Sequence, residues 1–246
     1  MFLIIKTIRT YIFWFLTTAI FLPICLLLSL LPEDIRRNRV YYFFTFIWDR
    51  LLVFFSFVLV KVEGKENLPK YPQKPAVFVM NHISSLDIPI IEDLIGTYPH
   101  VWISKAEYAK IPLWGTLLKR MHVLVDRHSP QKSMRALVKA CNLVKNKNIH
   151  LLVFPEGTRS ADGKLQNFLR GFATLAKKVQ RSVIPVAIIG TNKVMPKKSF
   201  WLNPRASDVK LIIGKSFSLK DDESEKDFVE RVQNWFRQTL DKDACE

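Results

Sequence analysis

Apolar positions along the chain divide it into two regions. Residues 10–32 form an apolar run without a charge, and residues 40–60 form a second run whose only charges are Asp49 and Arg50. From Lys65 onward, short apolar runs alternate with polar segments, as in a soluble domain. This pattern predicts a hydrophobic two-helix membrane anchor over residues 1–60 and an α/β domain over residues 61–246.

The second region predicts alternating strands and helices. Short apolar runs predict strands at 76–80, 100–103, 123–125, 151–154, 183–189 and 209–213. Several of these runs are apolar throughout, as buried strands of an α/β sheet are. Helical spacing predicts helices over 168–179, 228–240 and a segment that begins at Ser129-Pro130 and continues through 134–144. We therefore expect an α/β fold with a mostly parallel or mixed central sheet flanked by helices.

Two prolines mark a linker between the anchor and this domain, at Lys65–Lys74. A cleaved signal peptide is disfavoured, because no small-x-small cleavage site follows the first apolar run. Pro23 is expected to interrupt that run, and the second is rich in aromatic residues, which is typical of the membrane interface.

Basic residues flank the two apolar runs at three places: Lys6 and Arg9; Arg36, Arg37 and Arg39; Lys61 and Lys65. The positive-inside rule would keep all three clusters in the cytoplasm. It favours an anchor that dips into one leaflet, with the α/β domain on the cytoplasmic face of the inner (plasma) membrane. A transmembrane hairpin, which would export the Arg36–Arg39 loop, is the alternative.

The formal net charge is +15 over 246 residues. A basic surface attracts anionic lipid headgroups, nucleic acid or an acidic carrier protein, and charge alone does not choose among them. The three cysteines, Cys25, Cys141 and Cys245, lack metal-ligand spacing and are expected to be reduced, as in a cytoplasmic domain.

The segment Asn81–Asp87 offers a base and a carboxylate. His82 and Asp87 are five residues apart, which in a regular helix would separate them by about 140°. They can meet if a turn intervenes, and Ser84-Ser85 supplies turn chemistry, with Pro89 in the first turn of the following helix. Asp87 could then orient His82 as a general base. The alternative is a helix-capping Asp87 beside an unrelated histidine.

The segment Phe154–Ser160 follows a buried strand and suits an anion. Gly157 allows close backbone approach, and Arg159 can bind phosphate oxygens through two donors. Arg127 and Lys105 also follow predicted strands, so three cations are expected at three strand ends, where α/β folds bind ligands. The alternative is a surface turn with solvated cations. We predict no metal site, because the remaining histidines lack ligand spacing.

These segments together resemble the glycerolipid acyltransferase superfamily, and most closely the 1-acyl-sn-glycerol-3-phosphate acyltransferases. Asn81–Asp87 matches the family's NHxxxxD block and Phe154–Ser160 its FPEGTRS block, both in full. The third block matches His122–Arg127 in part, and the fourth, an apolar strand with a proline, matches Val183–Val186. Lys105–Gly115 also resembles the family's pattern, and Phe168–Gly171 has Arg170 where the family often has lysine. The likeness covers roughly residues 61–215.

The resemblance implies a transfer of a fatty acyl group to the 2-hydroxyl of lysophosphatidic acid, giving phosphatidic acid, without an acyl-enzyme. His82 would act as the base and Asp87 would orient it. Arg159, Arg127 and Lys105 would hold the phosphate, Gly157 and Thr158 would line its loop, and Glu156 would order that loop. The acyl donor would be acyl-CoA or acyl-ACP, with no cofactor.

Other functions stay open at this stage. The acceptor could be glycerol 3-phosphate, another lysophospholipid or a lipid-A-like precursor. A non-catalytic protein that binds membrane surfaces is a further alternative. Nucleic acid is not expected as a partner, because the basic residues are not interleaved with stacking aromatic residues.

Overall fold

The chain folds around one seven-stranded sheet. The computed structural model describes residues 2–69, 75–197, 199, 201–203 and 208–245. The strands are β1 (Leu59–Glu63), β2 (Val77–Met80), β3 (His100–Lys105), β4 (Val123–Val125), β5 (His150–Val153), β6 (Val183–Ile189) and β7 (Asp208–Ile213). Their order across the sheet is β1-β7-β6-β2-β5-β3-β4. All neighbours run parallel except the antiparallel pair β6–β7, so the sheet is mixed, as predicted.

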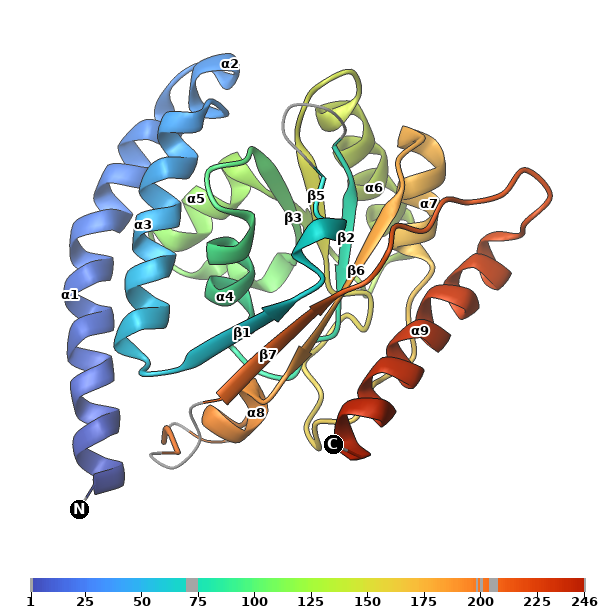
Figure 1. Ribbon diagram of the computed structural model, residues 1–246. Coiled ribbons are helices and arrows are strands. Elements are labelled where there is room, and N and C mark those ends of the chain that lie inside the picture. Colours follow the sequence, from blue (N-terminus) through green and yellow to red (C-terminus); the bar gives the residue numbers. More distant parts are fainter. Residues whose placement is uncertain (1, 70–74, 198, 200, 204–207, 246) are drawn as a thin grey trace.

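Helices cover both faces of this sheet (Figure 1). They are α1 (Phe2–Leu30), α2 (Glu33–Arg36), α3 (Arg39–Phe55), α4 (Asp87–Ile95), α5 (Trp114–Met121), α6 (Pro130–Val144), α7 (Gly171–Val179), α8 (Thr191–Val194) and α9 (Glu225–Cys245), with 3₁₀ turns η1 (Lys65–Asn67) and η2 (Ala106–Lys110). One core cluster joins the sheet to α6, α7 and α9. A second joins the opposite face to α4 and to residues of α1 and α3. The expected α/β architecture is therefore confirmed.

The sequence predicted six of the seven strands and missed β1. That strand begins at Leu59, inside the second apolar run, and its residues look like the end of the preceding helix. Of the expected linker Lys65–Lys74, residues 65–67 form η1 and residues 70–74 lie outside the described residues. The boundary between anchor and domain at residue 60 stays a prediction.

Pro23 was expected to break the first helix, and this expectation was wrong. Helix α1 continues through Pro23 to Leu30. Proline removes one backbone hydrogen bond, but in apolar surroundings the freed segment has no better backbone partners than those of the helix.

The expected two-helix apolar anchor is corrected to one apolar helix. Of the described helices, only α1 is long and apolar enough to cross a membrane, with a mean hydropathy of 2.2 over Ile4–Leu30. Helix α3 instead buries part of its surface, and Tyr41, Tyr42, Trp48 and Val53 are its buried residues. It packs between α1 and the domain helix α4.

The parallel strands bring the ends of four elements to one edge of the sheet. Strands β2, β3, β4 and β5 all run in the same direction. His82 follows β2, Lys105 ends β3, Arg127 follows β4 and Arg159 follows β5. The carboxyl ends of these strands therefore gather residues that are far apart in sequence.

Candidate active site

His82 and Asp87 form the dyad that the spacing allowed. The Nδ1 atom of His82 lies 2.8 Å from Oδ2 of Asp87. Residues 81–84 leave β2 as an irregular segment, Ser85 and Leu86 form a turn, and Asp87 is the first residue of α4, so the chain folds the carboxylate back toward the ring. Because the carboxylate accepts at Nδ1, the neutral ring carries its proton there and keeps a lone pair on Nε2.

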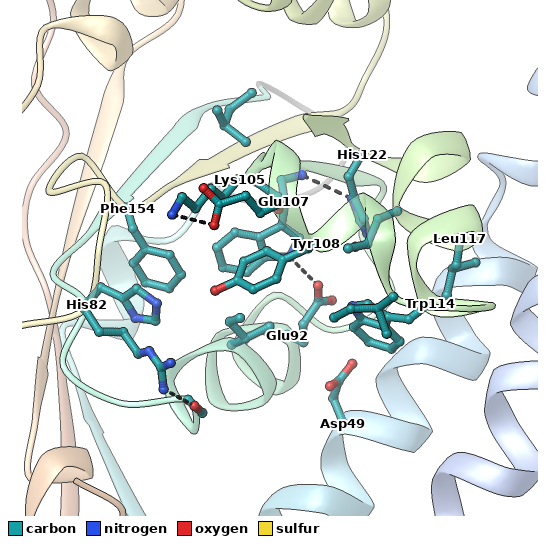
Figure 2. Close-up of a pocket in the computed structure, with 18 of the residues that line it drawn as sticks. Asp49, His82, Glu92, Lys105, Glu107, Tyr108, Trp114, Leu117, His122 and Phe154 are labelled. Atoms are coloured by element: carbon teal, nitrogen blue, oxygen red, sulfur yellow. Dashed lines mark hydrogen bonds and ion pairs between the residues drawn. The ribbon is translucent and has the colours of Figure 1, made fainter. Parts of the chain in front are cut away.

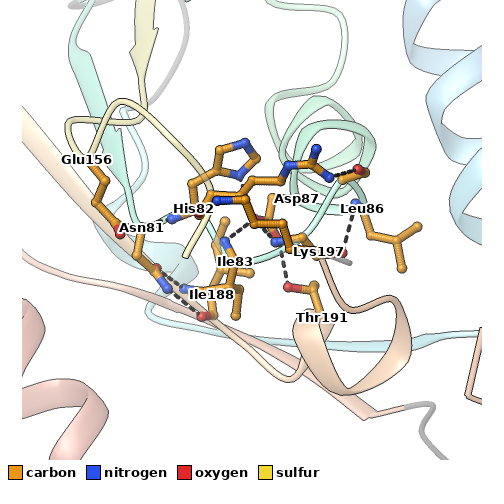
Figure 3. A network of polar contacts seen from close by, with 12 residues as sticks. Asn81, His82, Ile83, Leu86, Asp87, Glu156, Ile188, Thr191 and Lys197 are labelled. Atoms are coloured by element: carbon orange, nitrogen blue, oxygen red, sulfur yellow. Dashed lines mark hydrogen bonds and ion pairs between the residues drawn. The ribbon is translucent and has the colours of Figure 1, made fainter. Parts of the chain in front are cut away.

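Asp87 is fully buried and held by three further donors (Figure 3). Its Oδ2 atom accepts the backbone N–H groups of Ile83 and Ser84 at 2.7 and 2.8 Å. Its Oδ1 atom accepts the hydroxyl of Thr191 at 2.6 Å. These bonds fix the orientation of the carboxylate, which in turn fixes the His82 ring.

The His82 ring stacks on Phe154, with centroids 4.0 Å apart and an angle of 11° between the planes. Phe154 is the first residue after β5, so the stacking joins the two sequence segments into one site. The side chain of His82 is 12% exposed, and that exposure opens into a cavity.

Glu156 supports the backbone of His82 rather than lining the cavity. Its Oε1 accepts the N–H of His82 at 2.8 Å, and its Oε2 accepts the N–H of Gln166 at 3.1 Å. Burial raises the pKa of Glu156 to about 7. The carbonyl of His82 in turn accepts the N–H of Ser160 at 2.8 Å. The loop after β5 and the turn after β2 therefore hold each other in place.

Asn81 fixes the other side of this turn. Its side-chain amide donates to the carbonyl of Ile188 at 2.9 Å and accepts the N–H of Ile188 at 2.7 Å. The amide thus continues the ladder between β2 and β6 for one residue beyond the end of β2. His82 leaves the sheet at a defined point because this residue is an asparagine.

The cavity has a volume of about 560 Å³, within the range of small-molecule sites. Figure 2 shows His82 and Phe154 at one end and Trp114 and Leu117 at the other. Four cations line the cavity: Lys105, Arg127, Arg159 and Lys197. Apolar side chains from α3 and α5 line it too: Trp48, Leu52, Trp114, Leu117 and Leu118. Three acidic residues, Asp49, Glu92 and Glu107, complete the charged part of the lining. The cavity is suited to a molecule with an anionic head and a long apolar chain.

The structure brings the residues that were predicted to bind an anion together around Gly157. That glycine has a φ of +78°, and a Cβ there would lie 2.6 Å from Nη1 of Arg127. Arg159 lies beside the turn and donates to the hydroxyl of Ser85. Thr158 lines the cavity at the same loop. Lys105 lies on the rim, where its ammonium is 2.7 Å from Glu107.

Two site residues escaped the sequence reasoning. Thr191 binds Asp87 although 104 residues separate them. Lys197 lines the cavity and donates to the carbonyl of Arg159. Neither had a local signal, since a threonine after a strand and a lysine in Pro196-Lys197-Lys198 are typical of ordinary surface segments. The described residues also contain no group of three side chains able to hold a metal ion.

Comparison with known proteins identifies relatives of this site. A protein-family model described as acyltransferase matches residues 59–189. The chain is 34% identical over 166 residues to the chloroplastic 1-acyl-sn-glycerol-3-phosphate acyltransferase LPAT1 of Arabidopsis thaliana, which covers 68% of the chain and 46% of that protein. It is 31% identical over 190 residues to the 1-acyl-sn-glycerol-3-phosphate acyltransferase of Limnanthes douglasii, covering 76% and 65%. The chain thus spans about half to two thirds of the length of these curated relatives.

A solved structure extends the likeness to the whole chain. The crystal structure of the 1-acyl-sn-glycerophosphate (LPA) acyltransferase PlsC from Thermotoga maritima superposes with a TM-score of 0.81 at 27% identity, covering 100% of this chain and 99% of that one. The family model alone covers more than half of the chain and includes both the His82–Asp87 dyad and the loop around Gly157. The chain therefore belongs to the acyltransferase family.

Proposed function

We propose that this protein transfers a fatty acyl group from a thioester to the 2-hydroxyl of 1-acyl-sn-glycerol 3-phosphate, forming phosphatidic acid. One observation carries the proposal: a base oriented by a buried carboxylate shares a cavity with four cations and an apolar end. The names of the relatives support the same acceptor.

In the proposed reaction, Nε2 of His82 removes the proton from the 2-hydroxyl as the oxygen attacks the thioester carbonyl. The carbon–sulfur bond breaks, and the thiolate takes the proton from the imidazolium. Asp87 stabilises the cationic ring and holds it in position. General-base catalysis of this kind contributes about 10²–10⁴-fold, and positioning of the two substrates contributes further.

The hydrogen-bond partner of His82 supports direct transfer without an acyl-enzyme. In the described part of the chain, the hydrogen bond of the His82 ring goes to Asp87, not to a serine hydroxyl or a cysteine thiol that could be acylated. The Ser85 hydroxyl at the cavity accepts from Arg159 instead.

The phosphate of the acceptor would lie against Arg159, Arg127 and Lys197, with Lys105 at the rim. Guanidinium groups bind phosphate through paired donors, and Gly157 lets the backbone approach. Burial lowers the pKa of Arg127, and the charges of Tyr108 and Glu107 act in the opposite direction. The apolar end, lined by Trp114 and Leu117, would receive an acyl chain.

For the membrane we propose an anchor that lies in one leaflet, with the catalytic domain on the cytoplasmic side. Arg37, in the loop between α1 and α3, is buried and donates to the carbonyls of Met121 and Arg120 at the end of α5. Further along, Tyr42 donates to the carbonyl of His100 and Arg50 pairs with Asp93. A helix that binds the domain along its length stays on the same side of the bilayer as the domain.

The anchor is tested by the accessibility of single cysteines at Arg36 and Arg39 in intact cells, with Cys245 removed. We expect labelling by a membrane-impermeant maleimide only after the cytoplasmic side is opened. A cysteine at exposed Lys226 serves as the cytoplasmic control. Labelling of residues 36 and 39 from outside would contradict the one-leaflet anchor.

The activity is tested by thiol release from palmitoyl-CoA and palmitoyl-ACP with lysophosphatidic acid, glycerol 3-phosphate or no acceptor. We expect turnover with lysophosphatidic acid, loss of at least 10³-fold in His82→Ala, and a raised acceptor KM in Arg159→Ala. The exposed residues His128 and Arg237, changed to alanine, are matched controls that should keep wild-type rates. Turnover that persists in His82→Ala would refute the proposed base.

A further inference from the structure

Positive charge is concentrated in one stretch of the sequence. Residues 127–207 contain sixteen lysines and arginines but only two acids, Glu156 and Asp162. The net charge of the whole chain is +15, so this third of the chain accounts for nearly all of the excess. By contrast, α9 mixes acids and bases along its length. Such an asymmetry points to an anionic partner for one surface.

Helix α6, the residues just before α7 and the last turn of α7 carry a large part of this charge on an exposed surface. The exposed basic residues there are Lys132, Arg135, Lys139, Arg170, Lys177 and Lys178. Among them lie three exposed apolar side chains, Met134, Val138 and Leu169, which are 49%, 39% and 54% exposed. We call these nine residues the α6–α7 patch.

Contacts show that the two parts of the patch adjoin. A Cβ on Gly171, the first residue of α7, would lie 3.8 Å from Leu137 of α6. Met134 and Val138 are four residues apart in α6 and therefore lie on one side of the helix, and Leu137 lies one turn from Met134. Lys178 of α7 acts electrostatically on Cys141 of α6, where it opposes the rise in the thiol pKa caused by burial. The hydroxyl of Thr174 in α7 donates to the carboxylate of Glu225 at 2.8 Å.

The patch reaches the mouth of the catalytic cavity. Leu169 donates its N–H to the carbonyl of Pro155 at 2.9 Å, and its side chain lies beside Gly157. At the other end, α6 follows directly on Arg127, which lines the cavity. A partner seated on the patch could therefore extend a thioester into the cavity beside His82.

The patch faces away from the apolar helix. Helices α6 and α7 cover one face of the sheet, whereas α1, α3 and α4 cover the other, as Figure 1 shows at opposite sides of the molecule. A bilayer that receives the exposed apolar residues of α1 would lie on the far side of the protein from Arg135 and Lys139. The anion at the patch is thus better supplied by a soluble protein than by lipid headgroups.

We propose that the α6–α7 patch docks an acidic carrier protein that delivers the acyl thioester. The basic residues complement its acidic face, and Met134, Val138 and Leu169 supply the apolar centre of the contact. The inference rests on the proposed function, since it names the donor for that same site. Neither Arg135 nor Lys139 touches the catalytic cavity, so changing them tests docking separately from catalysis.

The experiment compares wild type with the double variant Arg135→Glu/Lys139→Glu. Detergent-solubilised protein is assayed with palmitoyl-ACP and palmitoyl-CoA, and binding of fluorescent palmitoyl-ACP is measured by anisotropy. We expect the KM and Kd for the carrier to rise at least tenfold with kcat retained, and palmitoyl-CoA kinetics to change less than twofold. The matched control Lys226→Glu/Lys242→Glu, on exposed positions of α9, makes the same charge change and should leave both donors unaffected.

Several outcomes would overturn the proposal. Wild type that does not bind palmitoyl-ACP excludes the carrier, even if palmitoyl-CoA turnover upholds the proposed function. If the double variant loses as much activity with palmitoyl-CoA in detergent as with palmitoyl-ACP, the patch binds the nucleotide part of coenzyme A. If the double variant loses activity only on anionic vesicles, and equally with both donors, the α6–α7 patch binds the membrane. Absence of turnover with either donor tells against the proposed function, and the binding measurement still decides the docking surface.

Discussion

At the residue scale, the site depends on a carboxylate that two distant segments hold. The spacing of His82 and Asp87, with serines between them, was enough to predict that they could meet, and they lie 2.8 Å apart. Thr191 could not be predicted, because its bond to Asp87 depends on how β6 ends beside β2. A turn of a few residues can be predicted from the local sequence, whereas hydrogen bonds between residues on different strands depend on how the strands are aligned.

Thr191→Val provides a test of that support. The change removes the bond to Oδ1 of Asp87 but keeps the shape of the side chain, so the carboxylate keeps only the bonds at Oδ2, from Ile83, Ser84 and His82. We expect kcat to fall about 10-fold with little change in KM, because the base is less well oriented. Thr191→Ser should restore most of the rate. An unchanged kcat in Thr191→Val would show that the backbone donors of Ile83 and Ser84 are sufficient.

Glu156 predicts a pH dependence of stability. Its folded pKa of about 7 lies above the ordinary value of 4.5, so the protonated form favours folding. Its stabilising contribution is fully present below pH 4.5 and is lost as the pH rises through 7, by at most about 1.4 kcal/mol per pH unit.

Glu156→Gln should therefore flatten the fall in stability between pH 4.5 and 7, measured by urea unfolding in detergent. The variant also leaves a backbone N–H facing an amide donor, so its stability should be lower at every pH. Glu223→Gln is an informative control, because a hydrogen bond from Arg231 lowers the pKa of Glu223 and its contribution is lost as pH falls. Parallel curves for wild type and Glu156→Gln would contradict the prediction.

At the scale of elements, the sequence predicted the strands that are buried runs between turn signals. The predicted boundaries of β4 and β6 match the structure, because polar or turn residues bound these apolar runs. Strand β1 was missed, since an apolar helix leads into it without such a break. Strand order could not be predicted either, because β5 enters between β2 and β3 through contacts far apart in sequence.

The loop after β5 is an element whose geometry can be tested at Gly157. Gly157→Ala combines a left-handed backbone, at φ +78°, with a Cβ only 2.6 Å from Arg127. We expect a loss of stability of about 1–2 kcal/mol and a several-fold rise in the KM for lysophosphatidic acid, because Arg127 must move.

Gly163→Ala is the matched control for this loop. Gly163 has the same φ of +78°, and its Cβ would meet Asn192 rather than a cavity residue. It should lower the Tm similarly but leave the acceptor KM unchanged. If the two variants have a similar KM for the acceptor, Arg127 does not contribute to acceptor binding.

At the scale of the whole molecule, the two faces of the sheet carry different surfaces. The apolar surface of α1 is left uncovered at Phe15, Ile20 and Leu27, which are 72%, 59% and 66% exposed. The opposite face carries the α6–α7 patch. The segregation of an apolar N-terminal region from a basic remainder was visible in the sequence, but its arrangement on opposite faces required the fold.

Phe15→Glu/Ile20→Glu is predicted to weaken membrane binding. Burying such side chains contributes about 1.5–3 kcal/mol each, so the affinity for phosphatidylcholine vesicles should fall at least tenfold. The affinity is measured from the fraction of protein that sediments with the vesicles. Met134→Glu/Val138→Glu, on the opposite face, should bind the vesicles like wild type. If both double variants lose binding equally, the bilayer does not distinguish the two faces.

The position of β1 at the sheet edge has a consequence for the order of folding during synthesis. Its neighbour in the described sheet is β7, which begins at Asp208, so β1 waits for almost 150 further residues before it can pair. Helix α1 leaves the ribosome long before that moment and can reach the bilayer first. We therefore expect that a nascent chain bound to the bilayer through α1 completes the sheet, so that this domain folds at the membrane surface.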